Sequence, residues 1–214
     1  MKIPASTAQY FVRAAREATL ATHSTYLPDF PHASWVPICS DHTGCPVFLI
    51  SHLAEHTKNL QASPNASLLI TQQGDKTTTR LTLIGTATPF DPTLDELDRF
   101  TKLLPESNAY LSLGGFRFYR FLPQALRFIA GFGQMGWLAG TTYLADCPGF
   151  SPEESRQLLT ELQRTTGWTL LTLDPYGLNL STSTDTNLRV STPSPLLAPE
   201  AFAAWSRQIL STLT

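Results

Sequence analysis

The chain has 214 residues, of which 42% are hydrophobic and 15% are charged, and its formal net charge at pH 7 is -2. This length allows one large domain, or a main domain with a smaller companion. The weak charge excludes a broad basic field, so we expect neither nucleic acid nor membrane as a partner. The sequence shows no apolar run of bilayer length and no signal-peptide pattern, which predicts a cytoplasmic protein.

The three cysteines, Cys39, Cys45 and Cys147, form an odd set without paired spacing, which predicts free thiols rather than a disulfide framework. Cys39-x-x-His42-x-x-Cys45 superficially resembles a zinc half-site. Only three ligands are present and they span a predicted hairpin, so we expect no metal site.

The first third of the chain reads as a helix followed by strands. Ser6 and Gln9 form a capping-box pattern for an opening helix that ends near Thr19. Two prolines then interrupt regular structure between the first and second strands. The predicted strands are Thr19–Thr22, Ser34–Cys39 and Val47–Ile50.

The stretch from Leu49 to Pro64 carries the first candidate site. Ser51 and His52 stop the third strand and are expected to cap a helix that begins near Leu53 and ends at Ser63. A strand that turns into a helix N-terminus gathers unpaired N–H groups and the positive end of the helix dipole, which attract a phosphate or a carboxylate. The nearby side-chain donors are Ser51, His52, His56 and Thr57. A capped turn without a ligand is the alternative.

The middle of the chain predicts a second set of strands. Ser67–Gln72 and Arg80–Ala87 pair around a turn at Gly74-Asp75. Asp91 and the following proline are expected to start a helix with Leu94, Leu97 and Leu104 on its inner face. A short helical segment over Pro105–Leu113 precedes two strands split by Pro123, which are Phe116–Leu122 and Ala125–Ile129.

Gly131-Phe132-Gly133 follows these strands. Two glycines around an aromatic residue permit the backbone to approach a flat ligand closely, and a glycine-softened barrel corner is the alternative. After Leu138 we expect a linker and then a small α+β unit. Its predicted elements are a helix capped by Ser151 and Glu154 and closed by Gly167, a hairpin of Trp168–Leu173 and Leu178–Ser183, a strand over Leu188–Ser191 and a helix over Pro199–Leu213.

Six segments in order, covering about two thirds of the chain, resemble the haem-utilisation proteins of the HugZ and HutZ type. They are TLAT, SWVP, PVFLISHLAEHTKNL, RLTLIGTA, PESNAYLSLGGFRFYRF and RFIAGFGQMGWL. That family belongs to the flavin-binding split barrels related to pyridoxamine 5'-phosphate oxidase. The resemblance implies a mainly β fold with helices (α+β), with an FMN-binding split β-barrel over residues 1–140 and a C-terminal α+β module over residues 150–214. It also implies a homodimer with cofactor sites between the subunits.

The resemblance implies FMN as the cofactor, with haem as the other candidate. His56 stands where the oxidases carry a phosphate-binding lysine, and Ser51, Thr57 and Arg80 are expected on the same anion side. Phe132 and Gly133 are expected near the ring. Ser34 replaces a phosphate-binding arginine, and a histidine with a pKa of about 6.5 is largely neutral at pH 7, so weak flavin binding is expected.

For haem, an imidazole ligand is needed, and all five histidines lie within the first 56 residues. In the haem-degrading relatives the axial histidine lies in the C-terminal part, which has none here. His56 is the candidate ligand, although a packed or capping histidine is the alternative. The resemblance thus implies an FMN-dependent oxidoreductase, or a haem-handling or haem-degrading protein of iron acquisition. The alternative is a non-catalytic binding or regulatory split-barrel protein.

Overall fold

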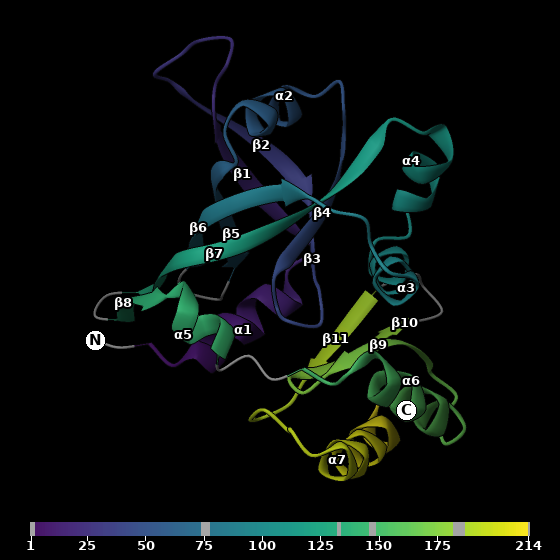
Figure 1. The fold of residues 1–214 in the computed structure, drawn as a ribbon. Coiled ribbons are helices and arrows are strands. Elements are labelled where there is room, and N and C mark those ends of the chain that lie inside the picture. Colours follow the sequence, from purple (N-terminus) through teal and green to yellow (C-terminus); the bar gives the residue numbers. More distant parts are fainter. Residues whose placement is uncertain (1–2, 74–77, 132–133, 146–148, 182–186, 214) are drawn as a thin grey trace.

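The computed structural model describes residues 3–73, 78–131, 134–145, 149–181 and 187–213. Within them, an eight-stranded antiparallel sheet curls into a half-open barrel, with strand order β2-β1-β5-β6-β7-β4-β3 and β8 paired with β7 (Figure 1). This confirms the expected mainly β class with helices. The strands are β1 Glu17–His23, β2 Pro31–Pro37, β3 Cys39–Ser40, β4 Pro46–Ser51, β5 Asn65–Gln73, β6 Thr78–Pro89, β7 Phe116–Gly131 and β8 Gln134–Ala139.

Alternating burial along the strands places the core. Leu68 and Ile70 of β5 and Leu81 and Leu83 of β6 are buried, while the residues between them are more exposed. The predicted pairing of these strands is therefore confirmed; their Gly74-Asp75 turn lies outside the described residues.

The prediction that Pro123 splits two strands is wrong, because β7 runs continuously through it. The ladder between β6 and β7 shifts register between Ile84 and Gly85, opposite Pro123. A proline is tolerated at a bulge, where the missing N–H removes no regular ladder bond. Gly85 also permits the close approach, since a Cβ there would lie 2.1 Å from the Leu122 carbonyl oxygen.

Five helices accompany this sheet: α1 Ala5–Ala14, α2 Glu55–Ala62, α3 Leu94–Leu103, α4 Ser107–Leu113 and α5 Gly140–Ala145. Ser6 lies inside α1 and does not cap it, and the buried Gln9 side chain instead donates to the Tyr143 carbonyl at 3.0 Å. α1 ends at Ala14 rather than near Thr19, because Ala15 is extended and leads directly into β1.

Two further cap predictions are wrong. Ala54, not Ser51 or His52, is the N-cap of α2, and it makes no side-chain cap bond. Thr93 caps α3 in a capping box with Glu96, in place of Asp91. Of the three leucines predicted on the inner face, Leu94 is 85% exposed, whereas Leu104 is buried and Leu97 packs against the same cluster. The end of α2 at Ser63 is as predicted.

The expected linker after Leu138 is also wrong, since it begins with the last residue of β8, Ala139, and contains α5. Tyr143 of α5 is fully buried, and its hydroxyl donates to the Gly44 carbonyl at 2.7 Å. This segment therefore belongs to the packed structure beside α1, with which α5 makes contact.

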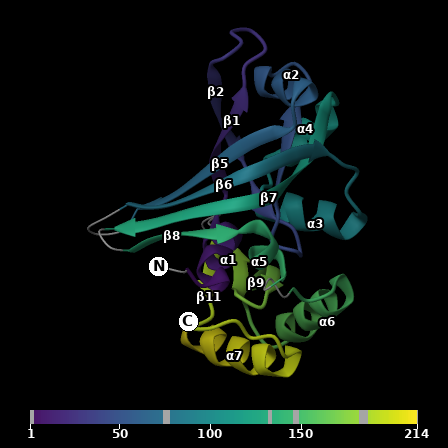
Figure 2. The same cartoon turned by 60° about the vertical axis from the view of Figure 1, so that its left-hand side comes forward.

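The C-terminal part has its own three-stranded sheet, in the order β11-β10-β9, covered by two helices (Figure 2). The elements are α6 Pro152–Gln163, β9 Thr169–Asp174, β10 Gly177–Ser181, β11 Asn187–Ser191 and α7 Pro199–Thr212. The capping box of Ser151 and Glu154 is confirmed, although α6 ends at Gln163 and not at Gly167. The division into domains 1–140 and 150–214 stays a prediction.

A buried ion cluster joins the C-terminal sheet to α1 and α3. Asp174, at the end of β9, lies 3.8 Å from Arg13 of α1, 3.4 Å from Arg99 of α3 and 2.8 Å from Arg189 of β11. All four side chains are at least nine-tenths buried. One carboxylate from the C-terminal sheet therefore contacts guanidinium groups of two helices that pack on the barrel.

None of the helices within the described residues is long and apolar enough to cross a bilayer.

Candidate functional site

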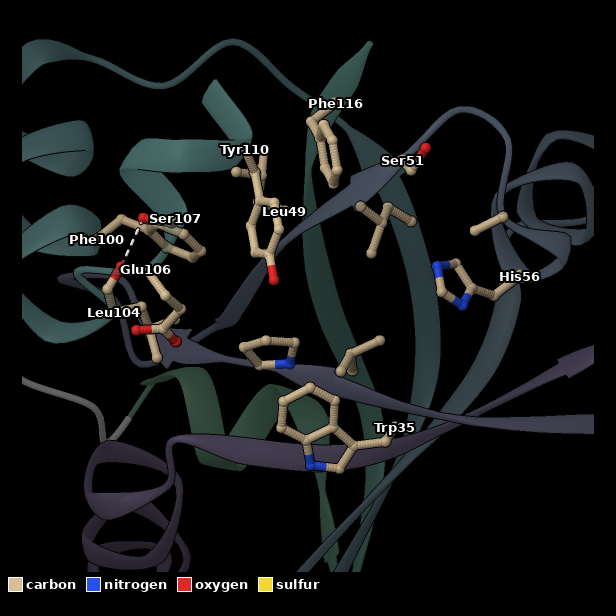
Figure 3. A pocket seen from close by; sticks show the side chains of 14 residues that line it. Trp35, Leu49, Ser51, His56, Phe100, Leu104, Glu106, Ser107, Tyr110 and Phe116 are labelled. Atoms are coloured by element: carbon tan, nitrogen blue, oxygen red, sulfur yellow. Dashed lines mark hydrogen bonds between the residues drawn. The ribbon is translucent and has the colours of Figure 1, made fainter. Parts of the chain in front are cut away.

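A cavity of about 250 Å³ lies where the barrel is open (Figure 3). β2 and β4 stand on its two sides, and they approach each other without forming a ladder. α2, α3, α4 and the first residue of β7 complete the walls. The lining residues are Trp35, Val36, Pro37, Leu49, Ile50, Ser51, Ala54, His56, Phe100, Leu104, Glu106, Ser107, Tyr110 and Phe116.

Aromatic side chains form two walls of this cavity. The rings of Tyr110 and Phe116 stack at 5.0 Å between centroids and 21° between planes. Figure 3 shows Trp35 on the other side, from β2. Trp35 is 63% exposed and Tyr110 is 40% exposed, so both also form part of the molecular surface. This arrangement suits a flat, largely apolar ligand.

His56 projects toward the cavity from the first turn of α2, opposite Glu106 and Tyr110 (Figure 3). Its Nδ1 lies 3.0 Å from the Ser34 hydroxyl of β2. Burial, and secondarily the charge of His32, lowers the pKa of His56 below 6.5. The imidazole is therefore neutral at pH 7. Among the described residues only Nδ1 of this ring has a hydrogen-bond partner, so Nε2 is the nitrogen available to a ligand.

The other residues of the strand-to-helix turn divide into lining and supporting roles. Ser51 lines the cavity, and its hydroxyl accepts a hydrogen bond from the Leu53 amide at 3.2 Å. Thr57 is buried outside the lining, and its hydroxyl donates to the Ser51 carbonyl at 2.6 Å. His52 is exposed, with Nδ1 lying 2.7 Å from the Gly115 carbonyl. Of these residues, only Ser51 meets the cavity.

This turn is a poorer anion site than its sequence suggests. The amide groups of Ala54, Thr57 and Lys58 donate to backbone carbonyls within the turn. Glu55 places a negative charge in the first turn of α2, where it already interacts with the helix dipole. The ammonium group of Lys58 is paired with Glu55 at 2.6 Å. Little unpaired positive charge is left for a phosphate.

Arg80 is not brought to this cavity within one chain. It is exposed on β6 opposite Ile129, whereas the cavity adjoins Phe116 at the other end of β7. These positions are up to roughly 40 Å apart along the strand, at about 3.3 Å per residue. Phe132 and Gly133 lie outside the described residues. The cofactor roles of these three residues stay predictions.

Of the 14 lining residues, the sequence predicted only Ser51 and His56 as site residues; the ones it missed include Trp35, Glu106 and Tyr110. All three lie within segments that carry the family resemblance, which is the signal that could have found them. Ser34 was noted only as a departure from the oxidases, whereas the structure places it against His56.

Residues 1–145 match the family model described as CREG, beta-barrel. The chain belongs to this β-barrel family. It is 34% identical over 114 residues to the non-canonical heme oxygenase HOZ, chloroplastic, of Arabidopsis thaliana, an alignment that covers 52% of this chain and 36% of that protein. The chain thus spans about a third of the length of this relative. The relationship to haem-utilisation proteins that the motifs predicted is confirmed.

Solved structures extend the similarity to the C-terminal part. A heme binding protein from Mycobacterium smegmatis is 22% identical, with a TM-score of 0.62 and coverage of 99% of both chains. The protein Atu2129 from Agrobacterium tumefaciens is 19% identical, with a TM-score of 0.71 and coverage of 95% of this chain and 94% of that chain. Campylobacter jejuni ChuZ is 19% identical, with a TM-score of 0.56 over 64% of this chain and 59% of that chain. These similarities confirm the split-barrel fold.

Proposed function

We propose that this chain binds haem in the cavity between β2 and β4, with His56 as the imidazole directed to the iron. The observation that carries this proposal is a neutral imidazole facing a mostly apolar, aromatic-walled cavity. A neutral histidine nitrogen is a common haem ligand. His56 is also the one histidine among the cavity-lining residues of the described structure.

The lining suits the porphyrin plane. Tyr110 and Phe116 offer a stacked aromatic surface, and Trp35 offers a second one. Haem held here would supply a redox-active iron for oxygen chemistry, while Tyr110, Phe116 and Trp35 would hold the ring and exclude water from its faces. The 34% identity to a non-canonical heme oxygenase supports haem degradation as the activity of the bound state.

A second copy of the chain completes the site in this proposal. The cavity of about 250 Å³ is smaller than the roughly 300–1,000 Å³ of typical ligand pockets. Its rim carries exposed aromatic side chains, which monomeric proteins seldom leave in contact with water as a group. A second copy that covers Trp35 and Tyr110 would add walls to the cavity, which enlarges it, and would also shield it from solvent.

An FMN-dependent oxidoreductase is the second candidate. Ser51 and His56, two residues expected at FMN, do line the cavity. None of the described lining residues is Lys or Arg, however, so a phosphate lacks a cationic partner there. This is why haem is the leading proposal. Haem bound without degradation would leave the chain as a binding or regulatory protein.

The test is a titration of the purified chain with haem, followed by its Soret band, and separately with FMN, followed by flavin fluorescence. We expect saturable haem binding at one per chain, and loss of the Soret band when a reductant is added in air. His56→Ala should weaken haem binding by at least about ten-fold.

The matched control is His23→Ala, because His23 is exposed on β1 and does not line the cavity. It should leave haem affinity unchanged. Saturable FMN binding without haem binding would replace the leading proposal by the second candidate. Equal losses in both variants would remove His56 from the site.

A further inference from the structure

The electrostatics of the cavity are set by one side chain. Of the 14 lining residues, Glu106 alone carries a formal charge at pH 7 once His56 is neutral. Arg99, next to Phe100, pairs with Asp174, and Arg120 of β7 pairs with Asp41 at 2.9 Å and with Glu96. Arg117, next to Phe116, is exposed and does not line the cavity. The described lining therefore has a net negative charge.

Glu106 lies on the α4 side of the cavity, where its charge faces the space that a ligand would fill. It is the N-cap residue of α4 with helical backbone angles (φ -60°, ψ -23°), so Tyr110, four residues later, lies on the same helix face. Figure 3 shows the Glu106 carboxylate and the Tyr110 hydroxyl projecting from the α4 side, across the cavity from His56.

Haem is electrically asymmetric. One edge of the porphyrin carries two propionates, and the opposite edge carries only methyl and vinyl groups. A propionate near Glu106 would lie next to a like charge, without a cationic lining residue to offset the repulsion. The methyl and vinyl edge meets no such penalty.

We propose that Glu106 is a specificity-determining residue that admits the uncharged edge of the porphyrin and keeps the propionates at the open rim. This inference deepens the proposed haem binding and rests on it. The ligand class is a flat ring with one uncharged edge, and rings that carry anionic groups on every edge are rejected.

The test compares dissociation constants for haem and for haem dimethyl ester, in which both propionates are esterified, in the wild type and Glu106→Gln at low salt. We expect Glu106→Gln to bind haem about two- to five-fold more tightly, because Glu106 is exposed and partly screened. Affinity for the ester should not change. The gain should shrink at high salt.

Glu200→Gln is the matched control, because it removes the same charge from the exposed first turn of α7, outside the cavity. It should change neither affinity. Equal haem affinity in wild type and Glu106→Gln overturns the inference, and so does equal weakening of haem and ester, which would make Glu106 a direct hydrogen-bond acceptor for the ligand.

A second readout separates this inference from the proposed function. Binding of anionic anilinonaphthalene sulfonate and of uncharged Nile red is measured by fluorescence in the same variants. If the chain binds no haem but Glu106→Gln tightens only the anionic dye, the haem proposal falls and charge selection by Glu106 stands. If Glu106→Gln changes the affinity for neither dye, charge selection by Glu106 is excluded, whether or not the chain binds haem.

Discussion

The Ser34 hydroxyl lies 3.0 Å from Nδ1 of His56, and this contact joins β2 to α2 beside the cavity. When Nδ1–H donates to the Ser34 oxygen, the Nε2 lone pair is left for an iron. Second-shell partners of this kind typically change metal affinity by about 10–100-fold. Ser34 is thus a positioning residue for His56.

Ser34→Ala is expected to lower haem affinity by about ten-fold, because the ring loses the bond that fixes its tautomer and orientation. Ser34→Thr keeps a hydroxyl and should restore most of the affinity. The measurements are a Soret titration and nitrogen NMR of the His56 ring in the ligand-free protein. An unchanged tautomer distribution in Ser34→Ala would contradict the assigned role.

The purified chain is expected to be a dimer by size-exclusion chromatography with light scattering. Trp35→Ser should shift it toward the monomer, because Trp35 is a large apolar side chain on the proposed interface. Leu197→Ser is the control, since Leu197 is similarly exposed, at 57%, in the segment before α7. A monomeric wild type, or equal effects of both substitutions, would exclude this interface.

Asp174→Asn is expected to lower the free energy of unfolding by about 3–5 kcal/mol, because Arg13, Arg99 and Arg189 would lose the carboxylate they share. Chemical denaturation at pH 7 measures this change. Asp95→Asn breaks an exposed pair with Arg156 and should cost no more than about 1 kcal/mol. Similar losses of unfolding free energy in both variants would show that the buried cluster stabilises the fold no more than an exposed ion pair does.

The same pair of proteins gives a pH test. Burial alone raises the pKa of Asp174, but the charges of Arg189, Arg13 and Arg99 lower it well below its usual range. A lowered folded-state pKa adds stability above the unfolded pKa of about 3.9, which is lost as pH falls toward the folded value. The stability difference between wild type and Asp174→Asn should be equal at pH 7 and pH 5 and smaller at pH 3. A difference that falls between pH 7 and pH 5 would contradict the lowered pKa.

Local sequence patterns predicted the structural features that are determined by residues close together in the chain. The pairing of β5 with β6 was predicted from the turn signal Gly74-Asp75, and the capping box of α6 followed from Ser151 and Glu154. The cap of α3 was misplaced because Asp91 and Thr93 both have capping side chains and stand two residues apart. The cap of α2 was misplaced because its N-cap, Ala54, has no capping side chain. Local propensity does not rank the first pair, and no side-chain pattern marks an alanine cap.

The site was predictable only in part, because local sequence patterns do not specify contacts between residues that are distant in the chain. Ser51 and His56 belong to one short motif, and both line the cavity. Glu106 and Tyr110 reach it from α4, and their proximity to His56 depends on how the sheet curls. The contact of Arg13 with Asp174 joins residues far apart in the chain, which no local pattern specifies.

The position of β2 has a mechanical consequence for the cavity. Among the described strands, β2 has a ladder with β1 alone, whereas β4 is held by β3 and by β7. The cavity therefore has one side, β4, that is paired on both edges, and one side, β2, that is an edge strand. Moving β2 away from β4 breaks no ladder hydrogen bond between these two strands, whereas β1 remains anchored by its ladder with β5. The contact of Ser34 with His56 is one of the side-chain contacts that such a movement would break. A planar guest wider than the cavity would therefore displace β2 at a lower cost in ladder hydrogen bonds than β4.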